Sequence, residues 1–314
     1  MAVIVLTSAA GSPGVTSTAV GLTLGWPRSV ILVDADQGAF QSVLAGYLRG
    51  QLPTGKGLQR VAEAHRDRRR LAEVISDETV PLTDDPMPSE RPTSAGSSTG
   101  ETTTTSSGGT GSTRPSRRLL PGFVRPANAA LFGPVWADLA DALAGYERAG
   151  IDVLVDAGRM GGQGLPQPLV DRADLVALML RSDLRSVAAA RNAVGLLSEQ
   201  GRAGGAEANL GLILLGENQP YGRREIARLL GLPAVSVIAD DPEAARVFSD
   251  GAPRGRRFDR SPLARTLRAA VDDLAGSVRR RRSLLGLADD LDLAASRPSL
   301  VPAASAVGGG EHHG

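Results

Sequence analysis

Short apolar runs alternate with amphipathic segments along most of the chain. Uninterrupted apolar runs of this length, rich in β-branched residues, are typical of strands buried on both faces of a parallel sheet. The pattern predicts strands at 2–7, 29–34, 118–124, 152–156, 175–180, 210–215 and 234–238. Apolar positions that return every three or four residues predict helices at 15–25, 58–76, 135–148, 184–199, 223–230 and 262–278.

This alternation predicts one α/β domain over residues 1–283, with a doubly wound, mostly parallel sheet and helices on both faces. Residues 82–118 interrupt it with a stretch rich in Ser, Thr, Gly and Pro, in which we expect a disordered insertion. Residues 284–314 are predicted to form a flexible C-terminal tail. His312 and His313 lie in that tail without a fixed third ligand, so no metal site is predicted there.

The composition excludes several classes of protein. The chain has 314 residues, of which 42% are hydrophobic and 22% charged, as in globular proteins. Without cysteine it can form neither disulfides nor thiolate metal sites. A net charge of +1 argues against a chain-wide basic surface for nucleic acid. No apolar run reaches 18 residues, so we expect no transmembrane helix and a cytoplasmic protein.

The loop after the first strand carries the first candidate site, in "SAAGSPGVTSTAV" at 8–20. Its glycines permit tight curvature, so successive backbone N–H groups can converge on an anion, and the following helix adds the positive end of its dipole. Two hydroxyls occupy the first helical turn, where phosphate-loop proteins bind Mg²⁺. The candidate nucleotide-binding residues are Gly11, Ser12, Pro13, Gly14, Val15, Thr16 and Ser17.

A phosphate loop normally ends in G-K-[ST], with the lysine on the β- and γ-phosphates. Here Val15 follows Gly14, and the single lysine of the chain is Lys56 in a different loop. Charge-assisted contacts are worth about 1.5–3 kcal/mol each. The sequence therefore predicts weak binding of ATP or ADP with Mg²⁺ and inefficient hydrolysis, and it leaves open whether the protein is an enzyme.

Three acids follow predicted strands. Asp34 and Asp36 close the second strand, and Asp156 stands at the end of the predicted strand in "DVLVDAG". Ligands of open α/β sheets bind at the carboxyl ends of strands, so these carboxylates are candidates for holding Mg²⁺ and positioning water. The alternative is that they cap the turns and helices that follow. Position alone does not decide between the two.

Several segments, taken in order, resemble the MinD/ParA family of deviant phosphate-loop ATPases. The similar stretches are "AGSPGVTS" at 10–17, the D-x-D pair Asp34 and Asp36, "VLVDAG", "ADLVALMLRSDLRSVAAARNAV" and "LGLPAVSVIADDPEAARVFSDGAP". The resemblance covers most of residues 1–275 and implies the fold of that family.

The resemblance also implies roles for individual residues. Thr16 matches the hydroxyl ligand of Mg²⁺, Asp36 the carboxylate that orients the attacking water, and Asp156 the acid near the metal, so these three are the candidate Mg²⁺ ligands. Ala10 stands where the family has its signature lysine, which reaches across a dimer, and Val15 stands at the phosphate-loop lysine. The carboxylate side of the site is thus present and both lysines are absent.

A branch of the family without regular loop lysines, the CpaE/TadZ type, positions pilus or secretion machinery. The resemblance therefore implies a pseudo-ATPase that acts as a spatial organiser or scaffold, in such machinery or in cell division, through protein partners and as a homodimer. One alternative is a slow or partner-dependent ATPase, in which Arg159 or Arg181 neutralises a phosphate. Another is a DNA-associated partition protein. Arg279–Arg282 are the candidate contact with DNA or with the inner face of the membrane.

Overall fold

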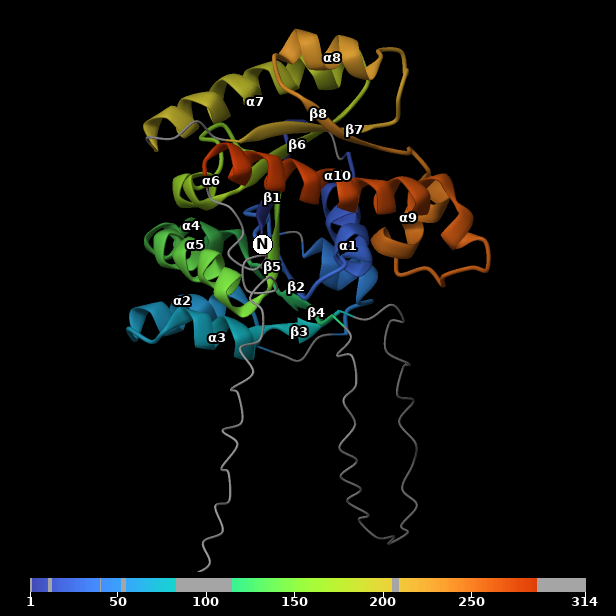
Figure 1. Cartoon of the computed structure of the whole chain (residues 1–314). Helices are drawn as coiled ribbons and strands as arrows, with labels where there is room; N and C mark the ends of the chain where they lie inside the picture. The colour runs from blue at the N-terminus through green and yellow to red at the C-terminus, as the bar shows by residue number, and fades with distance from the viewer. Residues whose placement is uncertain are drawn as a thin grey trace, which may run out of the picture.

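The computed structural model describes residues 2–10, 13–39, 41–51, 55–82, 115–204 and 209–286. They form an eight-stranded sheet in the order β3-β4-β2-β5-β1-β6-β7-β8 (Figure 1). All paired strands are parallel except β3 and β4. The strands are β1 Val3–Ser8, β2 Val30–Asp34, β3 Val80–Pro81, β4 Arg117–Leu120, β5 Asp152–Arg159, β6 Leu175–Arg181, β7 Leu210–Leu215 and β8 Ala234–Ile238.

Helices cover both faces of the sheet, which confirms the predicted doubly wound α/β fold (Figure 1). The α-helices are α1 Val15–Gly25, α2 Leu58–Arg66, α3 Leu71–Glu78, α4 Pro126–Ala130, α5 Trp136–Gly145, α6 Gln167–Arg172, α7 Leu184–Ala203, α8 Arg223–Leu230, α9 Pro242–Ser249 and α10 Pro262–Leu284. Shorter turns are the π-helix η1 Val43–Tyr47 and the 3₁₀-helices η2 Gly133–Val135, η3 Tyr146–Ala149 and η4 Phe258–Arg260.

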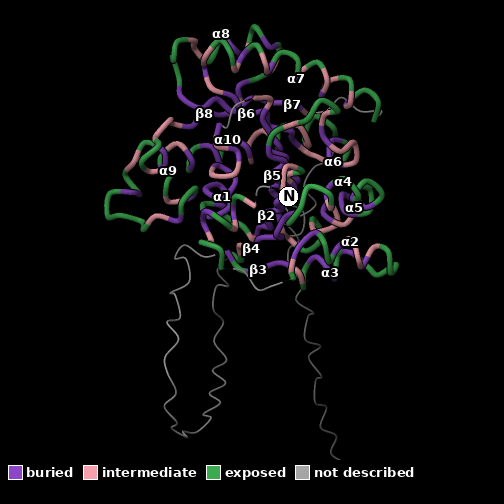
Figure 2. Tube along the Cα trace, turned by 180° about the vertical axis from the view of Figure 1, so that it is seen from behind, coloured by how far each residue is buried: buried purple, intermediate pink, exposed green. Residues whose placement is uncertain are grey.

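The period of two along each strand divides the core into layers. On β1, Ile4 and Leu6 pack with α1, α9 and α10, whereas Val3 and Val5 pack with α2, α3 and α5 on the other face. Helices α7 and α8 cover β6 and β7 in a third cluster. Figure 2 shows the buried strands at the centre and the exposed outer sides of the helices around them.

The predicted single helix at 58–76 is wrong, because the chain forms α2 and α3 with a break between them. The apolar residues of α2 begin at Leu58 and those of α3 at Leu71. At about 100° per residue, thirteen positions turn the second set to the opposite side of a continuous helix. Residues 67–70 are all charged, and Arg68 takes a left-handed φ of 56°, so the chain turns there and both sets reach the core.

The edges of the expected insertion also differ from the prediction. Leu82 is buried, and Arg117 and Arg118 belong to β4, which pairs with both β2 and β3. These residues complete one side of the sheet. The expectation of disorder at 83–114 lies outside the described residues. At the other end, α10 runs to Leu284, and residues 287–314 of the predicted tail are likewise not described.

Both outermost strands of the sheet expose few free backbone N–H and C=O groups with which a further strand could pair. β3 is two residues long and ends in Pro81. Along β8, the Arg223 guanidinium donates to the carbonyl of Ala234, with Nε at 3.1 Å. The Thr266 hydroxyl accepts a hydrogen bond of 3.0 Å from the N–H of Ala239, one residue beyond β8. Short strands, proline and side chains placed on the edge are the usual protection against strand pairing.

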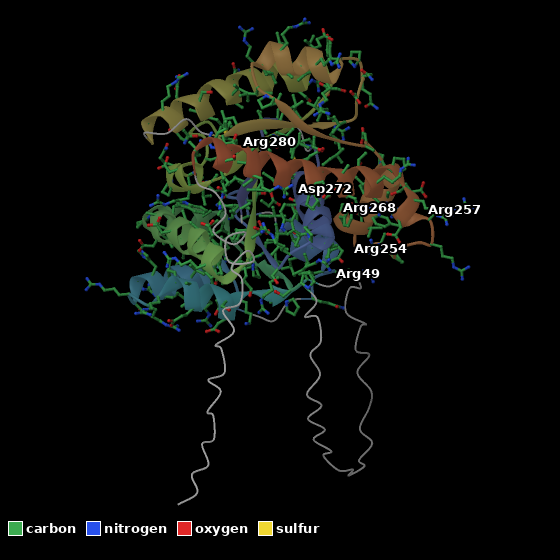
Figure 3. All side chains as sticks on the ribbon, viewed as in Figure 1. Arg49, Arg254, Arg257, Arg268, Asp272 and Arg280 are labelled. Atoms are coloured by element: carbon green, nitrogen blue, oxygen red, sulfur yellow. The ribbon has the colours of Figure 1, made fainter. Side chains whose placement is uncertain are left out.

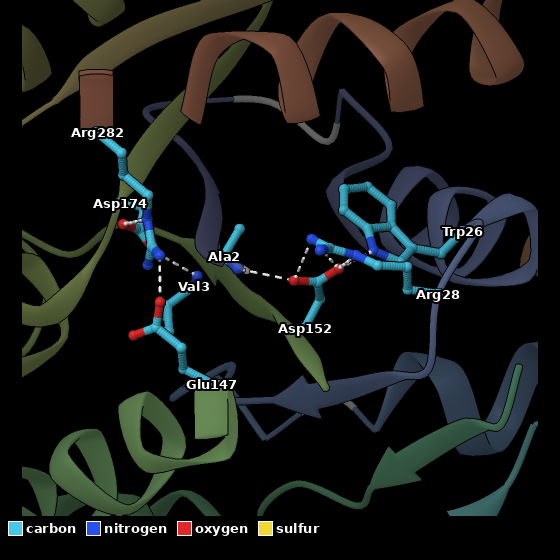
Figure 4. Close-up of polar contacts among 8 residues, drawn as sticks. All are labelled: Ala2, Val3, Trp26, Arg28, Glu147, Asp152, Asp174 and Arg282. Atoms are coloured by element: carbon cyan, nitrogen blue, oxygen red, sulfur yellow. Dashed lines mark hydrogen bonds and ion pairs between the residues drawn. The ribbon is translucent and has the colours of Figure 1, made fainter. Parts of the chain in front are cut away.

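Two acidic residues anchor the amino end of the sheet (Figure 4). Asp152 is fully buried and accepts hydrogen bonds from the N–H of Ala2 at 2.7 Å, from Trp26 Nε1 at 2.7 Å, and from Arg28 Nε and Nη2 at 2.9 Å each. Asp174 accepts from Arg282 at 2.8 and 3.0 Å. These contacts join β1, β5 and the end of α10 on the side opposite the carboxyl ends of the strands.

Candidate functional site

A cleft of about 720 Å³ lies at the carboxyl ends of the central strands. Segments that are far apart in the sequence line it: Ser8, Pro13, Gly14, Val15, Thr16, Ser17, Asp36, Ser42, Ala45, Gly46, Gly158, Arg159, Phe248, Ser249 and Asp250. The structure thus gathers the predicted loop residues from Pro13 to Ser17 with Asp36. The other two predicted loop residues, Gly11 and Ser12, lie outside the described residues.

The start of α1 leaves backbone donors at this cleft. Gly14 takes a left-handed conformation (φ 81°, ψ 36°) at the N-cap, and no side chain caps the helix. The first helical bond runs from the N–H of Thr18 to the carbonyl of Gly14, at 2.9 Å. Helix geometry therefore leaves the N–H groups of Val15, Thr16 and Ser17 without intrahelical acceptors. Such a group of donors, with the helix dipole, binds anions.

Val15, which the sequence pattern aligns with the lysine of a phosphate loop, has its side chain in the core. It is 6% exposed and lies in the apolar cluster of α1, α9 and α10. Among the described residues that line the cleft, Arg159 is the only one with a cationic side chain. The cleft therefore combines backbone donors and hydroxyls with little positive charge.

Asp34, the last residue of β2, pairs with Asp156, which lies three residues before the end of β5. Burial raises the pKa of Asp34 to about 8, and the charge of Asp156 adds to the rise. Burial also raises the pKa of Asp156, to about 6, while the Thr16 hydroxyl and the N–H of Gly158 oppose the rise by favouring its ionised form. Because both carboxyl groups are buried and close together, full ionisation of the pair is unfavourable unless a proton or a cation binds between them.

The site has an oxygen suited to a magnesium ion. Oδ1 of Asp156 accepts the N–H of Gly158 at 2.9 Å, whereas its buried Oδ2 has no hydrogen-bond partner in the described part of the chain. The described residues contain no cluster of three or more acidic or histidine side chains that would hold a metal alone. Mg²⁺ usually takes one or two carboxylates together with phosphate and water oxygens, so Asp156 and Thr16 fit the ion as part of a nucleotide complex.

Asp36 reaches the cleft through a close contact with the backbone. Its Oδ1 accepts the N–H of Gly38 at 2.8 Å. A Cβ on Gly158 would lie 2.4 Å from the carboxyl carbon of Asp36, and Gly158 has a φ of 59°. Only glycine leaves room for the carboxylate here. Asp34 and Asp156, by contrast, are buried and do not line the cleft, although the Thr16 hydroxyl, which does, contacts Asp156.

Gly158→Ala is therefore expected to displace Asp36 as well as to strain the backbone. Strain at a left-handed position costs about 1–2 kcal/mol. Gly150→Ala is the matched control, because Gly150 has a φ of 79° and no atom within 4 Å of the new Cβ. Urea unfolding of the two variants should show the larger loss for Gly158→Ala. Equal losses would mean that the contact with Asp36 has no energetic consequence.

The two arginines considered for phosphate neutralisation lie in different places. Arg181, at the end of β6, forms an ion pair with Asp240 and does not line the main cleft. It borders a second cleft of about 240 Å³ on another side of Gly14. Arg159 lines the main cleft, and its side chain forms no ion pair within the described ranges.

Sequence reasoning missed the wall of the cleft opposite the loop. It consists of η1, with Ser42 and Gly46, and of the end of α9, with Phe248, Ser249 and Asp250. A Cβ on Gly46 would lie 2.1 Å from the carbonyl oxygen of Ser249, so these two elements touch through their backbones. The glycine in "SVLAGY" was the only local signal of this contact.

The predicted contact surface Arg279–Arg282 is not one continuous surface. Arg282 turns inward to Asp174 and Glu147, and its side chain is 16% exposed (Figure 4). Arg280 lies on the outer side of α10, which also carries Arg268 and the acidic Asp272 (Figure 3). Charges of both signs thus follow this helix. In the ranges that the structure describes, no helix combines the length and apolar character needed to cross a membrane.

Comparison with known proteins gives a partial sequence match to a curated relative. No protein-family model matches the chain. An uncharacterized protein of Mycobacterium tuberculosis, found in two strains, is 36% identical over 156 residues. The match covers 44% of this chain and 42% of that protein, so it spans less than half the length of the curated relative.

The solved structures identify the fold. The MinC:MinD cell division complex of Aquifex aeolicus has a TM-score of 0.60 at 15% identity, covering 88% of this chain and 96% of that one. MinD of Pyrococcus horikoshii, complexed with Mg-ADP, gives 0.59 at 16% identity, covering 88% and 98%. A ParA family ATPase of Chlorobium tepidum gives 0.59 at 14%, covering 87% and 98%. The chain has the MinD/ParA type of P-loop NTPase fold.

Proposed function

We propose that this chain is a MinD/ParA-type protein with a degenerate nucleotide site, which acts as a spatial organiser or scaffold through protein partners. The observation that carries the proposal is the buried Val15 at the start of α1, where a phosphate loop has its lysine. The anion-binding backbone persists, but the cation that would hold the β- and γ-phosphates is replaced by a core residue. Such a site holds Mg²⁺-nucleotide weakly and does not hydrolyse it efficiently.

In this proposal each group at the cleft has a binding role. The N–H groups of Val15, Thr16 and Ser17 take phosphate oxygens, and Mg²⁺ adds positive charge to the phosphates when it is bound. Oδ2 of Asp156 and the Thr16 hydroxyl are the groups that would hold the ion. Asp36, which lines the cleft, would accept a hydrogen bond from a water there. These groups bind and orient, and no lysine supports a developing charge on the phosphates.

The MinD and ParA proteins of similar fold suggest where such a scaffold acts. The similar MinD structure contains MinC, a partner protein. We infer a role in positioning a cell-division, pilus or secretion assembly, with a homodimer as the working form. The CpaE/TadZ branch is a precedent for members without regular loop lysines. The second candidate, a slow or partner-dependent ATPase, is favoured by the retained Asp36 and Asp156.

Val15→Lys tests the degenerate site directly. A lysine at this position can keep its stem in the core and send its amine into the cleft. We expect Mg²⁺-ADP to bind the variant about 10- to 100-fold more tightly than the native protein, which corresponds to one charge-assisted contact. Calorimetric titration measures this difference, and Val15→Met is the control for side-chain length without charge.

The outcomes separate the candidate functions. Weak or absent binding by the native protein, with affinity regained in Val15→Lys alone, supports the scaffold. ATP turnover by the native protein above the uncatalysed background would favour the slow ATPase instead. Absence of binding in both proteins would show that the loop no longer forms a nucleotide site at all.

A further inference from the structure

Among the described residues that line the main cleft, the one cationic side chain is that of Arg159, three residues after Asp156. Arg159 is exposed, lines the main cleft together with Gly14, Thr16 and Ser17, and forms no ion pair within the described residues. Other arginines near this edge are engaged: Arg181 with Asp240, and Arg49 with the carbonyl of Gly251. The positive charge of Arg159 thus lies near the N–H groups at the start of α1, and no acidic side chain of the described residues neutralises it.

A bulge in β5 puts Arg159 on this side of the sheet. Leu6 of β1 pairs with Asp156 of β5. Ser8 lies two residues after Leu6, but its partner Arg159 lies three residues after Asp156. The extra residue falls at Gly158, whose carbonyl accepts the Thr7 hydroxyl at 3.1 Å and whose φ is 59°. A bulge re-aims the side chains that follow it.

The direction of this change can be worked out from the alternation of side chains. Leu154 packs in the core with α1, whereas Val155 and Ala157 pack on the other face, so a regular strand would turn residue 159 away from α1. The bulge moves Arg159 into the register position opposite Ser8, on the same face as Asp156. The chain leaves β1 at Ser8 and enters the phosphate loop, so the bulge brings the guanidinium to that loop.

We infer that Arg159 is the cation that contacts the phosphates of a bound nucleotide, in place of the phosphate-loop lysine. This inference rests on the proposed function, because it names the residue that supplies the charge lost at Val15. The ligand class is a nucleoside di- or triphosphate with Mg²⁺. A guanidinium carries five donors in a planar fork and pairs with phosphate oxygens through two parallel hydrogen bonds. It enters from the strand side of the cleft, whereas a loop lysine would enter from α1.

Arg159→Gln tests the inference by calorimetric titration with Mg²⁺-ADP, Mg²⁺-ATP and adenosine. We expect the variant to bind both nucleotides about tenfold or more weakly than the native protein, and Arg159→Lys to lose less. Adenosine has no phosphate, so any adenosine binding should be unchanged. Arg191→Gln, an exposed arginine on α7, controls for a general change in surface charge.

The second test is a double variant that moves the positive charge from position 159 to position 15. Val15→Lys combined with Arg159→Gln should bind Mg²⁺-ADP at least as well as the native protein. Arg159→Gln with native affinity for both nucleotides would overturn the inference and leave the proposed function standing. A native protein that binds no nucleotide, beside a Val15→Lys variant that does, would also overturn it and would support a degenerate site. If neither the native protein nor Val15→Lys bound nucleotide, the proposed function itself would be contradicted.

Discussion

Asp152→Ala is expected to lower the free energy of unfolding by about 3–5 kcal/mol, the cost typical of breaking a buried ion pair. Asp152 is fully buried and accepts from Ala2, Trp26 and Arg28. The alanine would leave two buried donors, the N–H of Ala2 and Nε1 of Trp26, without acceptors, at about 1–3 kcal/mol each. The side chain of Arg28 is 45% exposed and can turn to water, so it adds less.

The melting temperature should fall by roughly 6–20 °C, at about 2–4 °C per kcal/mol for a domain of this size. Differential scanning calorimetry measures the shift. Arg246→Ala is the control, because it removes an ion pair with Asp250 whose partners are 67% and 52% exposed, and such pairs contribute less than about 1 kcal/mol. If Asp152→Ala and Arg246→Ala had the same melting temperature, the network of Figure 4 would not stabilise the amino end of the sheet.

Asp34→Asn is expected to remove a loss of stability that the native protein shows between pH 6 and 8. The pKa of Asp34 is raised from 3.8 to about 8, chiefly by burial. Between these values the native state holds the proton and the unfolded state has released it. Stability is therefore complete below about pH 4 and falls as the pH rises toward 8, by about 1.4 kcal/mol per pH unit for one proton. Asparagine resembles the protonated carboxyl and cannot ionise.

Urea unfolding in metal-free buffer at pH 6, 7 and 8 measures this difference. The pKa of Asp156 is raised only to about 6, so the window above pH 6 reports mainly Asp34. We expect Asp34→Asn to be more stable than the native protein at pH 8. Asp67→Asn, at an exposed position, should follow the native profile. A native profile without slope between pH 6 and 8 would mean that Asp34 is ionised in the folded protein.

The sheet could be predicted from the sequence because its strands are buried on both faces. The runs 175–180 and 210–215 contain no charged or hydroxyl side chain, and the structure places the buried strands β6 and β7 there. Helices with a single apolar stripe, such as α8 and α10, were equally clear. Burial acts on each of these segments separately, so a local pattern is sufficient.

Elements without a local pattern could not be predicted. Helices α4 and α6 have five and six residues, fewer than two turns, so no apolar period can be recognised. Helix α9 begins at Pro242 after an Asp241 cap, a signal that was present in the sequence but not used. The bulge at Gly158 depends on pairing between strands almost 150 positions apart, which no local pattern contains.

The candidate site was predicted in part for the same reason. The start of α1, Asp36 and Asp156 lie at or soon after the carboxyl ends of the predicted strands, and parallel strands bring those ends together. The direction of the Val15 side chain and the opposite wall at Phe248 depend on how α9 and α10 pack against α1. Those contacts join residues more than 200 positions apart.

The protected outer strands limit how copies of this chain can associate. A strand from a second molecule would have to displace the Arg223 guanidinium from the carbonyl of Ala234 on one side, and on the other it would meet Pro81, which has no N–H. Continuous sheet growth across molecules is therefore disfavoured at either side. Contacts between two copies of this chain would therefore have to use its helical surfaces or the rim of the cleft, which side chains and not backbone edges form.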